Sequence, residues 1–403
     1  MPTAPPAEAA TRPGGRRVGL VIAGLLALGY LPMVFLGPGT DLDVGGVWRS
    51  GQAILDGDYV VSRLPGAPVF EAVVGVLHAV GGSALVNLAS LAMAALTAWA
   101  LVTLLRREGV AHAEWAALVV LVHPVVWIAG TSMVDFLWAT GFLLSGAVAR
   151  RRSPVAAGVL YALAAGCRAS SLLVAGAFVL ADLLDRDPTM RRRGLVAGVV
   201  AVALTGVIYL PPLLVYGSTV FDSGVPSSSL PVQIGRFGVK NLFFFGPVAV
   251  VTVAVLVPRL LRAIREGWSV SWLVRAGLLT FVVAELVFLR FPWKLAHLIP
   301  ALLGLVLLLA GARLLSSRVL AVLLVAHLLL AVVNVRWAQP DRANQATGAE
   351  VSPTLVEGQL LRDLRCRLDG DRDAYRRADG LDELATTWDC VVPWGDEEHP
   401  APG

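Results

Sequence analysis

Long apolar runs fill most of the sequence and restrict what the chain can fold into. Several approach or exceed the ~20 residues that an α-helix needs to cross a bilayer, and 56% of the 403 residues are hydrophobic against 15% charged. In lipid, only helices and closed barrels satisfy every backbone hydrogen bond. Because the runs are long and continuous, the sequence predicts an all-α polytopic membrane protein.

Eleven runs are candidates for membrane-spanning helices. The first, 18–36, follows Arg12, Arg16 and Arg17. It is long for the apolar part of a signal peptide and no small-x-small cleavage site follows it, so we interpret it as an uncleaved span. The other ten runs, whose ends are defined to within several residues, are 84–105, 113–129, 134–149, 154–167, 170–184, 195–217, 241–258, 272–289, 295–311 and 319–335.

The basic residues indicate how these helices are oriented. With the N-terminus in the cytoplasm, the expected inner segments carry 18 basic residues, the outer loops 7 and the tail the other 8. Cytoplasmic loops of membrane proteins show such an excess. We therefore expect a multi-pass protein of the plasma membrane with a cytoplasmic segment 1–17, a membrane domain 18–335 and an extracytoplasmic tail 336–403. The net charge of +4 does not indicate a nucleic-acid partner.

A short apolar segment, 68–82, is interpreted as a helix lying on the outer interface. It contains Glu71 and His78, and counting it as a span would invert every later loop and place the arginine clusters outside. The acidic segment before it, "GTDLDVGGVWRSGQAILDGDYVVSRLPGAPVFE", then belongs to one large outer loop, 37–83.

This loop places carboxylates close to the membrane surface. Asp41 and Asp43 follow the first span within seven residues. A carboxylate there suits a general base that takes a proton from a sugar or lipid hydroxyl. Alternatively, the D-x-D pair holds a divalent metal that neutralises a diphosphate, or the segment is an ordinary solvated loop.

The order of several short motifs resembles that of the C-type glycosyltransferases, integral membrane enzymes that use polyprenyl-phosphate sugars. The mannosyl- and arabinosyltransferases of actinobacterial envelopes are similar. The resemblance covers residues 18 to about 310. It rests on an acidic residue after the first span, "WRSGQAILDGDY" and "RLPGAP" in the outer loop, "HPVVWIAGTSMVDFLWATGFLL", "GCRASSLL" and "LRFPWKLAHLIP".

The resemblance implies Asp43 as catalytic base, since the family's usual acid-to-glycine interval runs from Asp43 to Gly57, with Asp41 next. It implies transfer of a hexose or pentose from a polyprenyl-phosphate donor to an envelope glycan or lipid acceptor, by one inverting displacement at the outer face. No cofactor is required, and a divalent metal is possible. The rival hypotheses are a transporter or lipid-linked-sugar flippase, which needs charge along a pathway, and a membrane scaffold whose tail binds a partner.

Other polar residues near the expected outer face are candidates for contacts with the donor. Arg290, Lys294 and His297 cluster beside two spans, where they either bind phosphate or snorkel at a helix end. Arg168, at the tip of a short helical hairpin, needs a partner, either phosphate or Asp135. The remaining candidates are Asp58, Arg63, Asp135 and Glu285, of which Glu285 alternatively pairs with Arg290.

Two further segments carry expectations. The polar loop 218–240 is either a lid over the site or a plain connector. In the tail, 354–368 has helical spacing and "WDCVVPW" has strand character. Cys366 and Cys390 either form a disulfide outside the cell or remain free thiols.

Overall fold

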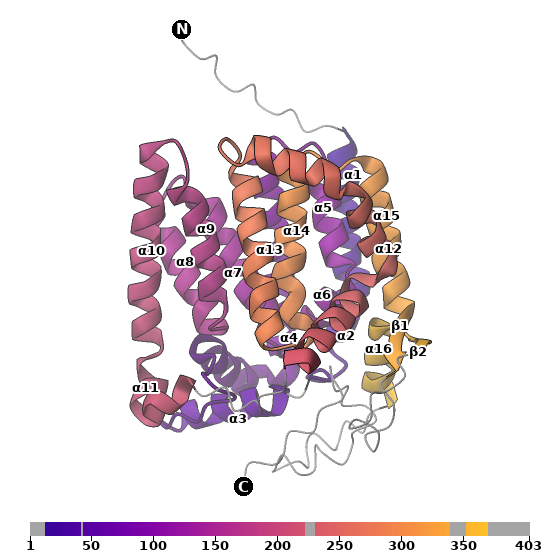
Figure 1. The fold of residues 1–403 in the computed structure, drawn as a ribbon. Helices are drawn as coiled ribbons and strands as arrows, with labels where there is room; N and C mark the ends of the chain where they lie inside the picture. The colour runs from indigo at the N-terminus through magenta and orange to yellow at the C-terminus, as the bar shows by residue number, and fades with distance from the viewer. Residues whose placement is uncertain (1–12, 42, 222–229, 293, 339–351, 370–403) are drawn as a thin grey trace.

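The computed structural model describes residues 13–41, 43–221, 230–292, 294–338 and 352–369. These residues form a bundle of helices with a small strand pair at its edge (Figure 1). The first expected span is α1 (Pro13–Gly24), which continues through the π-helical turn η1 (Leu25–Tyr30) into α2 (Leu31–Val34).

Four helices in the described part of the chain are long and apolar enough to cross a membrane, or five when one bent pair counts as a single span. The bent pair is α10 (Pro188–Ile208) with the segment Leu210–Val220, which contains α11 (Leu210–Tyr216) and most of η2 (Gly217–Phe221). Shorter apolar helices pack among them, so the all-α membrane fold is confirmed, while the number of eleven spans stays a prediction. They are α7 (Phe136–Ala149), α8 (Pro154–Cys167), α9 (Ser171–Leu183), η3 (Leu295–Leu298) with α14 (Ile299–Gly311), and α15 (Ser317–Val332).

One expected helix and one expected loop differ in the structure. The run 113–129 is divided into α5 (Ala113–Leu121) and α6 (Pro124–Ala129), because the residue before Pro124 is extended and proline cannot donate a backbone hydrogen bond. The expected loop 218–240 is largely helical where it is described. Its second half begins α12 (Leu230–Gly267), which precedes α13 (Trp272–Arg290).

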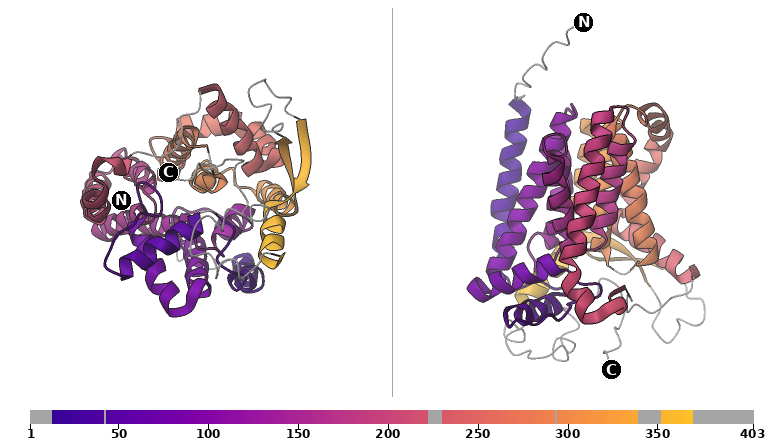
Figure 2. Two further views of the ribbon diagram at one scale, coloured as in Figure 1. Left: turned by 90° about the horizontal axis from the view of Figure 1, so that it is seen from below. Right: turned by 90° about the vertical axis from the view of Figure 1, so that its left-hand side faces the viewer.

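The interfacial segment forms the first arm of α4 (Pro68–Arg107). This helix breaks at Gly81 and Gly82, and Gly82 has a φ of +62°, a conformation that glycine adopts without strain. The arm packs against α3 (Asp43–Leu55) at one end of the bundle, called here the site end (Figure 2). A Cβ on Gly75 would lie 2.3 Å from the Gly51 carbonyl oxygen, so the two helices cross in direct backbone contact.

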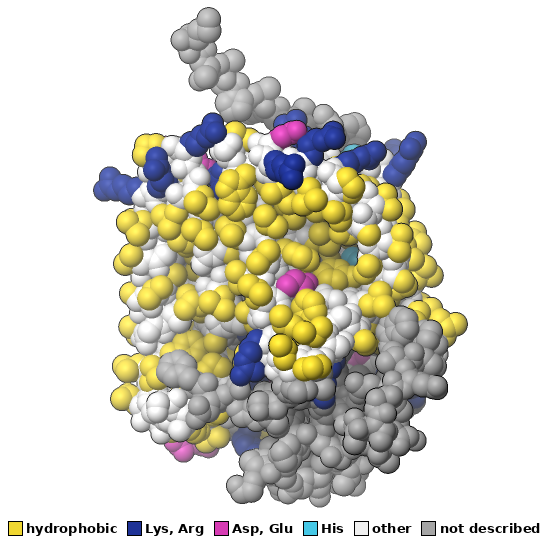
Figure 3. All heavy atoms as spheres, in the orientation of Figure 1, with side chains coloured by type: hydrophobic (Ala, Val, Ile, Leu, Met, Phe, Trp, Pro, Cys, Tyr) yellow, Lys and Arg dark blue, Asp and Glu magenta, His cyan; other side chains and the backbone are white. Residues whose placement is uncertain are grey.

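The opposite end of the bundle, where α1 begins, is basic. Figure 3 shows basic side chains gathered there, and these are arginines, because the only lysines of the chain are Lys240 and Lys294. Two buried arginines form ion pairs that join the helix ends: Arg150 pairs with Glu108 at 3.1 Å and with Asp182 at 3.3 Å, and Arg275 pairs with Asp185. The arginine clusters and the acidic loop thus lie at opposite ends of the bundle. Which end faces the cytoplasm stays a prediction.

The chain after the last membrane helix differs from expectation. The expected span 319–335 ends at Val332, and an antiparallel pair follows, β1 (Val333–Ala338) with β2 (Ser352–Glu357). The expected tail helix begins only at α16 (Gln359–Asp369), because the residues before it form β2. The expected strand "WDCVVPW" and Cys390 lie outside the described residues, so the pairing of Cys366 with Cys390 stays a prediction.

Candidate active site

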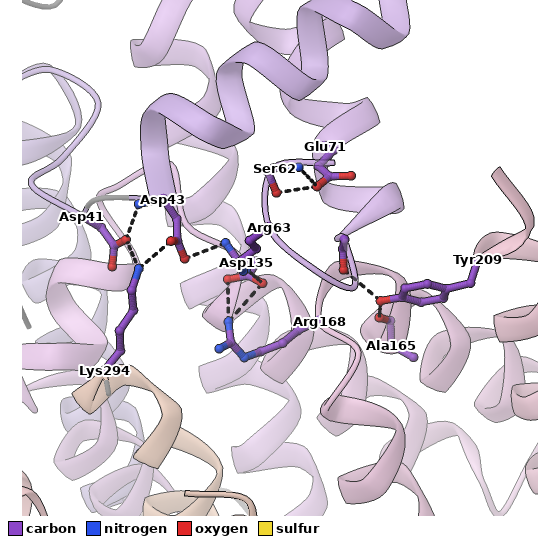
Figure 4. A network of polar contacts seen from close by, with 11 residues as sticks. Asp41, Asp43, Ser62, Arg63, Glu71, Asp135, Ala165, Arg168, Tyr209 and Lys294 are labelled. Atoms are coloured by element: carbon purple, nitrogen blue, oxygen red, sulfur yellow. Dashed lines mark hydrogen bonds and ion pairs between the residues drawn. The ribbon is translucent and has the colours of Figure 1, made fainter. Parts of the chain in front are cut away.

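Six charged side chains meet at the site end of the bundle (Figure 4). They come from segments far apart in the sequence: the loop before α3 together with the first residue of α3, the loop after α3, the start of α7, the end of α8 and the segment before η3. All six are among the residues that the sequence analysis proposed. They are Asp41, Asp43, Arg63, Asp135, Arg168 and Lys294.

Lys294 links Asp41, in the loop before α3, to Asp43, the first residue of α3. Its Nζ lies 2.6 Å from Asp41 Oδ1 and 2.8 Å from Asp43 Oδ1. The Asp43 backbone N–H donates to Asp41 Oδ1 at 2.8 Å, which fixes the two carboxylates relative to each other. The Asp43 side chain is 20% exposed against 8% for Asp41. Asp43 is therefore the more exposed carboxylate of this pair.

Arg63 links Asp43 to Asp135. Its Nη1 donates to Asp43 Oδ2 at 2.7 Å, and its Nη2 donates to Asp135 Oδ2. Asp135, only 1% exposed, also accepts from Arg168 Nη1 at 3.0 and 3.2 Å. The Arg168 guanidinium lies over the Phe136 ring, 3.9 Å from its centroid. In this structure Arg168 pairs with Asp135, and a contact of Arg168 with phosphate stays a prediction.

The six residues form a chain of alternating charge, with three carboxylates and three cations. Burial alone would raise the pKa of Asp43, but Arg63 and Lys294 outweigh it and lower the pKa below its ordinary value. Burial likewise opposes the charge on Arg63, yet Asp135 and Asp43 outweigh it and raise its pKa. Both groups are therefore ionised at neutral pH.

A second polar group, centred on Glu71, shapes the turn that presents Arg63. Glu71 is fully buried, and its Oε1 accepts from the Ser62 backbone N–H at 3.0 Å and from the Ser62 hydroxyl. Its Oε2 accepts from the Tyr59 hydroxyl at 2.6 Å, and burial together with Glu71 raises the pKa of Tyr59. The sequence analysis did not propose Glu71 as a site residue. The signal was present, since a charge inside an apolar segment needs a partner.

The remaining sequence candidates lie outside the chain of charges. His297 lies beside it, with its ring centroid 5.7 Å from that of Phe136. Arg290 is exposed and lies over the ring of its neighbour Phe291. Asp58 is exposed and accepts from the next backbone N–H. The alternative pairing of Glu285 with Arg290 is wrong, because Glu285 accepts instead from Asn241 Nδ2 at 3.0 Å.

The D-x-D pair bears on the metal hypothesis. The Lys294 ammonium lies between the carboxylates of Asp41 and Asp43, in the position that this hypothesis gives to a divalent cation. Across the described ranges, no group of three or more His, Cys, Asp or Glu side chains is arranged to hold a metal ion. Metal dependence stays a prediction.

The fold and this site define a polytopic helical membrane protein with an ion-paired polar site at one end of its bundle. No protein-family model and no curated protein sequence matches the chain. Among solved structures, the chain is similar to the crystal structure of ArnT from Cupriavidus metallidurans bound to undecaprenyl phosphate, with a TM-score of 0.55 and 20% identity. The match covers 80% of this chain and 64% of that one, so the chain spans less than two thirds of ArnT. The likeness confirms the fold that the C-type glycosyltransferase motifs predicted.

Proposed function

We propose that the protein is a membrane glycosyltransferase that moves a sugar from a polyprenyl-phosphate donor to an envelope glycan or lipid acceptor. The chain of alternating charge at the site end carries this proposal. It joins a reachable carboxylate to three cations. Support comes from the fold shared with a protein solved with undecaprenyl phosphate.

Asp43 is the proposed general base. It is ionised, and among the three carboxylates it is the most exposed, at 20% against 8% for Asp41 and 1% for Asp135. It takes the proton of the acceptor hydroxyl while that oxygen attacks the anomeric carbon. The bond from the anomeric carbon to the phosphate oxygen breaks, polyprenyl phosphate leaves, and one displacement inverts the anomeric centre.

The three cations are proposed to stabilise the leaving phosphate. Lys294 has three donors, and Arg168 contacts Asp135 through Nη1, while its Nε and Nη2 donate to no acceptor among the described residues. We propose that both side chains contact phosphate oxygens. A carboxylate held by two cations is a weak base. When donor phosphate draws Lys294 away from Asp43, the pKa of Asp43 rises and the carboxylate becomes a better base. Donor binding thereby prepares the base for the acceptor.

The finer parts of the proposal concern the sugar and the membrane face. A hexose or pentose is transferred, with mannose and arabinose the first to test. The reaction takes place at the outer face of the plasma membrane, since the acidic loop lies opposite the basic end. The acceptor belongs to the cell envelope.

The test uses purified protein in lipid nanodiscs with a panel of radiolabelled polyprenyl-phosphate hexoses and pentoses and crude envelope acceptors. The matched control is Asp43→Asn, which keeps the side-chain shape but cannot take a proton. We expect labelled product from wild type and none above background from the variant. If wild type consumes no donor, yet proteoliposomes move a fluorescent lipid-linked sugar between leaflets, the protein is a flippase and the proposal is wrong.

A further inference from the structure

Helix α16 contains a buried ion pair that is not part of the chain of charges. Arg367 Nε lies 2.8 Å from Asp363 Oδ2, one helical turn away, and both side chains are 1% exposed. A buried ion pair stabilises a protein only when the other polar atoms of its two side chains are also bound. The partners of those atoms therefore show what the pair does.

The Arg367 guanidinium bridges two segments of the membrane domain. Its Nη1 donates to the carbonyl oxygens of Thr131 at 2.9 Å and Met33 at 3.2 Å, and its Nη2 donates to Ser132 Oγ at 2.5 Å. Met33 lies near the end of the first membrane helix. Thr131 and Ser132 precede Asp135 closely. One planar, rigid group thus binds the segments that lead to the aspartates of the site.

Asp363 binds the loop residue next to the site. Its Oδ1 accepts from Thr40 Oγ1 at 2.6 Å, and Thr40 immediately precedes Asp41. The same loop is joined to the second segment, because the Met133 N–H donates to the Pro38 carbonyl oxygen at 2.9 Å. A Cβ on Gly39 would lie 2.7 Å from Ser132 Cβ and Oγ, so the two segments are in close contact.

The position of α16 is set by the last membrane helix. The Gly358 N–H donates to the Val332 carbonyl oxygen at 2.8 Å. A Cβ on Gly358 would lie 2.5 Å from backbone atoms of Ala331 and Val332, which leaves no room for a side chain. The start of α16 is therefore pressed against the end of α15.

We propose that Arg367 and Asp363 are positioning residues of the site. They hold segments 33–41 and 131–135 at the spacing at which Lys294 and Arg63 join Asp41, Asp43 and Asp135. Neither residue touches the six charged side chains, so they act through the loops. The effect on transfer rests on the proposed function, whereas the effect on loop order does not. The chain after the last membrane helix is then part of the site's framework and not a separate appendage.

Three variants test this role. Thr40→Val removes one hydroxyl with almost no change in shape. The double variant Asp363→Leu with Arg367→Met removes both buried charges, which avoids the penalty of an unpaired ion but abolishes every hydrogen bond from the pair to the two loops. Arg365→Ala is the matched control on the same helix, where the side chain is 52% exposed and pairs with Glu357.

The measurements are hydrogen exchange of segments 38–43 and 131–135, and steady-state kinetics on monodisperse protein. We expect faster exchange at both segments in the double variant, a smaller increase in Thr40→Val, and wild-type exchange in Arg365→Ala. Displacing a catalytic group by 1 Å costs about 100-fold, so we expect a drop in kcat of that order for the double variant with little change in donor KM.

Wild-type exchange and wild-type kcat in the folded double variant would overturn the proposal. A loss of stability with unchanged kcat per folded molecule would also overturn it, since it would show a purely structural role. If wild type itself transfers no sugar, the proposed function fails, and the exchange data alone then decide whether α16 orders the two loops.

Discussion

Replacing Asp43 and Asp135 separately by asparagine should distinguish a reacting carboxylate from a structural one. In Asp43→Asn, both cations that contact residue 43 keep a second carboxylate: Lys294 keeps Asp41 at 2.6 Å, and Arg63 keeps Asp135. The side chain of Asp43 is also 20% exposed. The fold should therefore tolerate the change.

The cost of Asp43→Asn should appear in the reaction. Loss of a general base lowers rates by ~10²–10⁴-fold, which corresponds to about 3 to 5 kcal/mol of barrier. We expect transfer to fall by this amount while donor binding remains, because the phosphate contacts come from cations.

Asp135→Asn should instead reduce stability. Asp135 provides the one ion pair that Arg168 forms among the described residues, and the two side chains are 1% and 13% exposed. Removing one member of a buried pair costs about 3 to 5 kcal/mol, a large part of the 5–15 kcal/mol that is typical of a whole domain.

The assay measures transfer of radiolabelled sugar and thermal unfolding on the same nanodisc samples. The reasoning is refuted if Asp43→Asn slows transfer by no more than a few-fold. It is also refuted if Asp43→Asn destabilises the protein as much as Asp135→Asn, because the second carboxylates would then not support the cations.

Three further predictions follow from the same contacts. Lys294→Ala should raise donor KM and lower kcat together, while Arg290→Ala, which removes an exposed side chain lying over Phe291, should change both much less; kinetics with the same donor compare them. Because the folded-state pKa of Asp43 is lowered, its contribution to stability is complete above its unfolded pKa of about 3.9 and is lost as pH falls through the folded value. The stability difference between wild type and Asp43→Asn should thus be constant from pH 5 to 8 and shrink below about pH 4 in thermal unfolding. Since Lys294 already lies between the two carboxylates, dialysis against EDTA should leave transfer unchanged, and activity that returns only with added divalent cation would contradict this.

The sequence identified the residues of the site better than it identified their partners. A charged side chain within an apolar membrane protein is energetically costly, so each one near the membrane is a reasonable candidate for a functional residue. The same argument also proposed Arg290 and Asp58, which lie outside the chain of charges. It could not exclude them, because residue type and position relative to the membrane do not show in which direction a side chain points. The contact of Lys294 with Asp41 joins residues 253 positions apart and depends on how the bundle packs.

The role of α16 was not predictable for a different reason. Its helical spacing was visible in the sequence. Asp363 and Arg367, however, are charged residues of the kind that usually lies on the exposed face of a helix. Their burial depends on where β1, β2 and Gly358 direct the chain after α15. Local pattern predicts that a helix forms, but the face that it buries depends on tertiary contacts.

Each of the three cations in the chain of charges is paired with a carboxylate, and this has a consequence for product release in the proposed reaction. The proposed donor is a phosphodiester with one negative charge, whereas the proposed leaving group, a phosphate monoester, carries −1.5 to −2 at pH 7. If the proposed reaction holds, the same cations bind polyprenyl phosphate more strongly than the donor. Asp41, 8% exposed and 2.6 Å from Lys294, competes with the product for that ammonium. Asp41→Asn removes the competitor, so polyprenyl phosphate should inhibit the variant at a lower concentration than wild type while single-turnover transfer changes little. Inhibition titrations with polyprenyl phosphate test this, and an unchanged or weaker inhibition would show that Asp41 does not compete for Lys294.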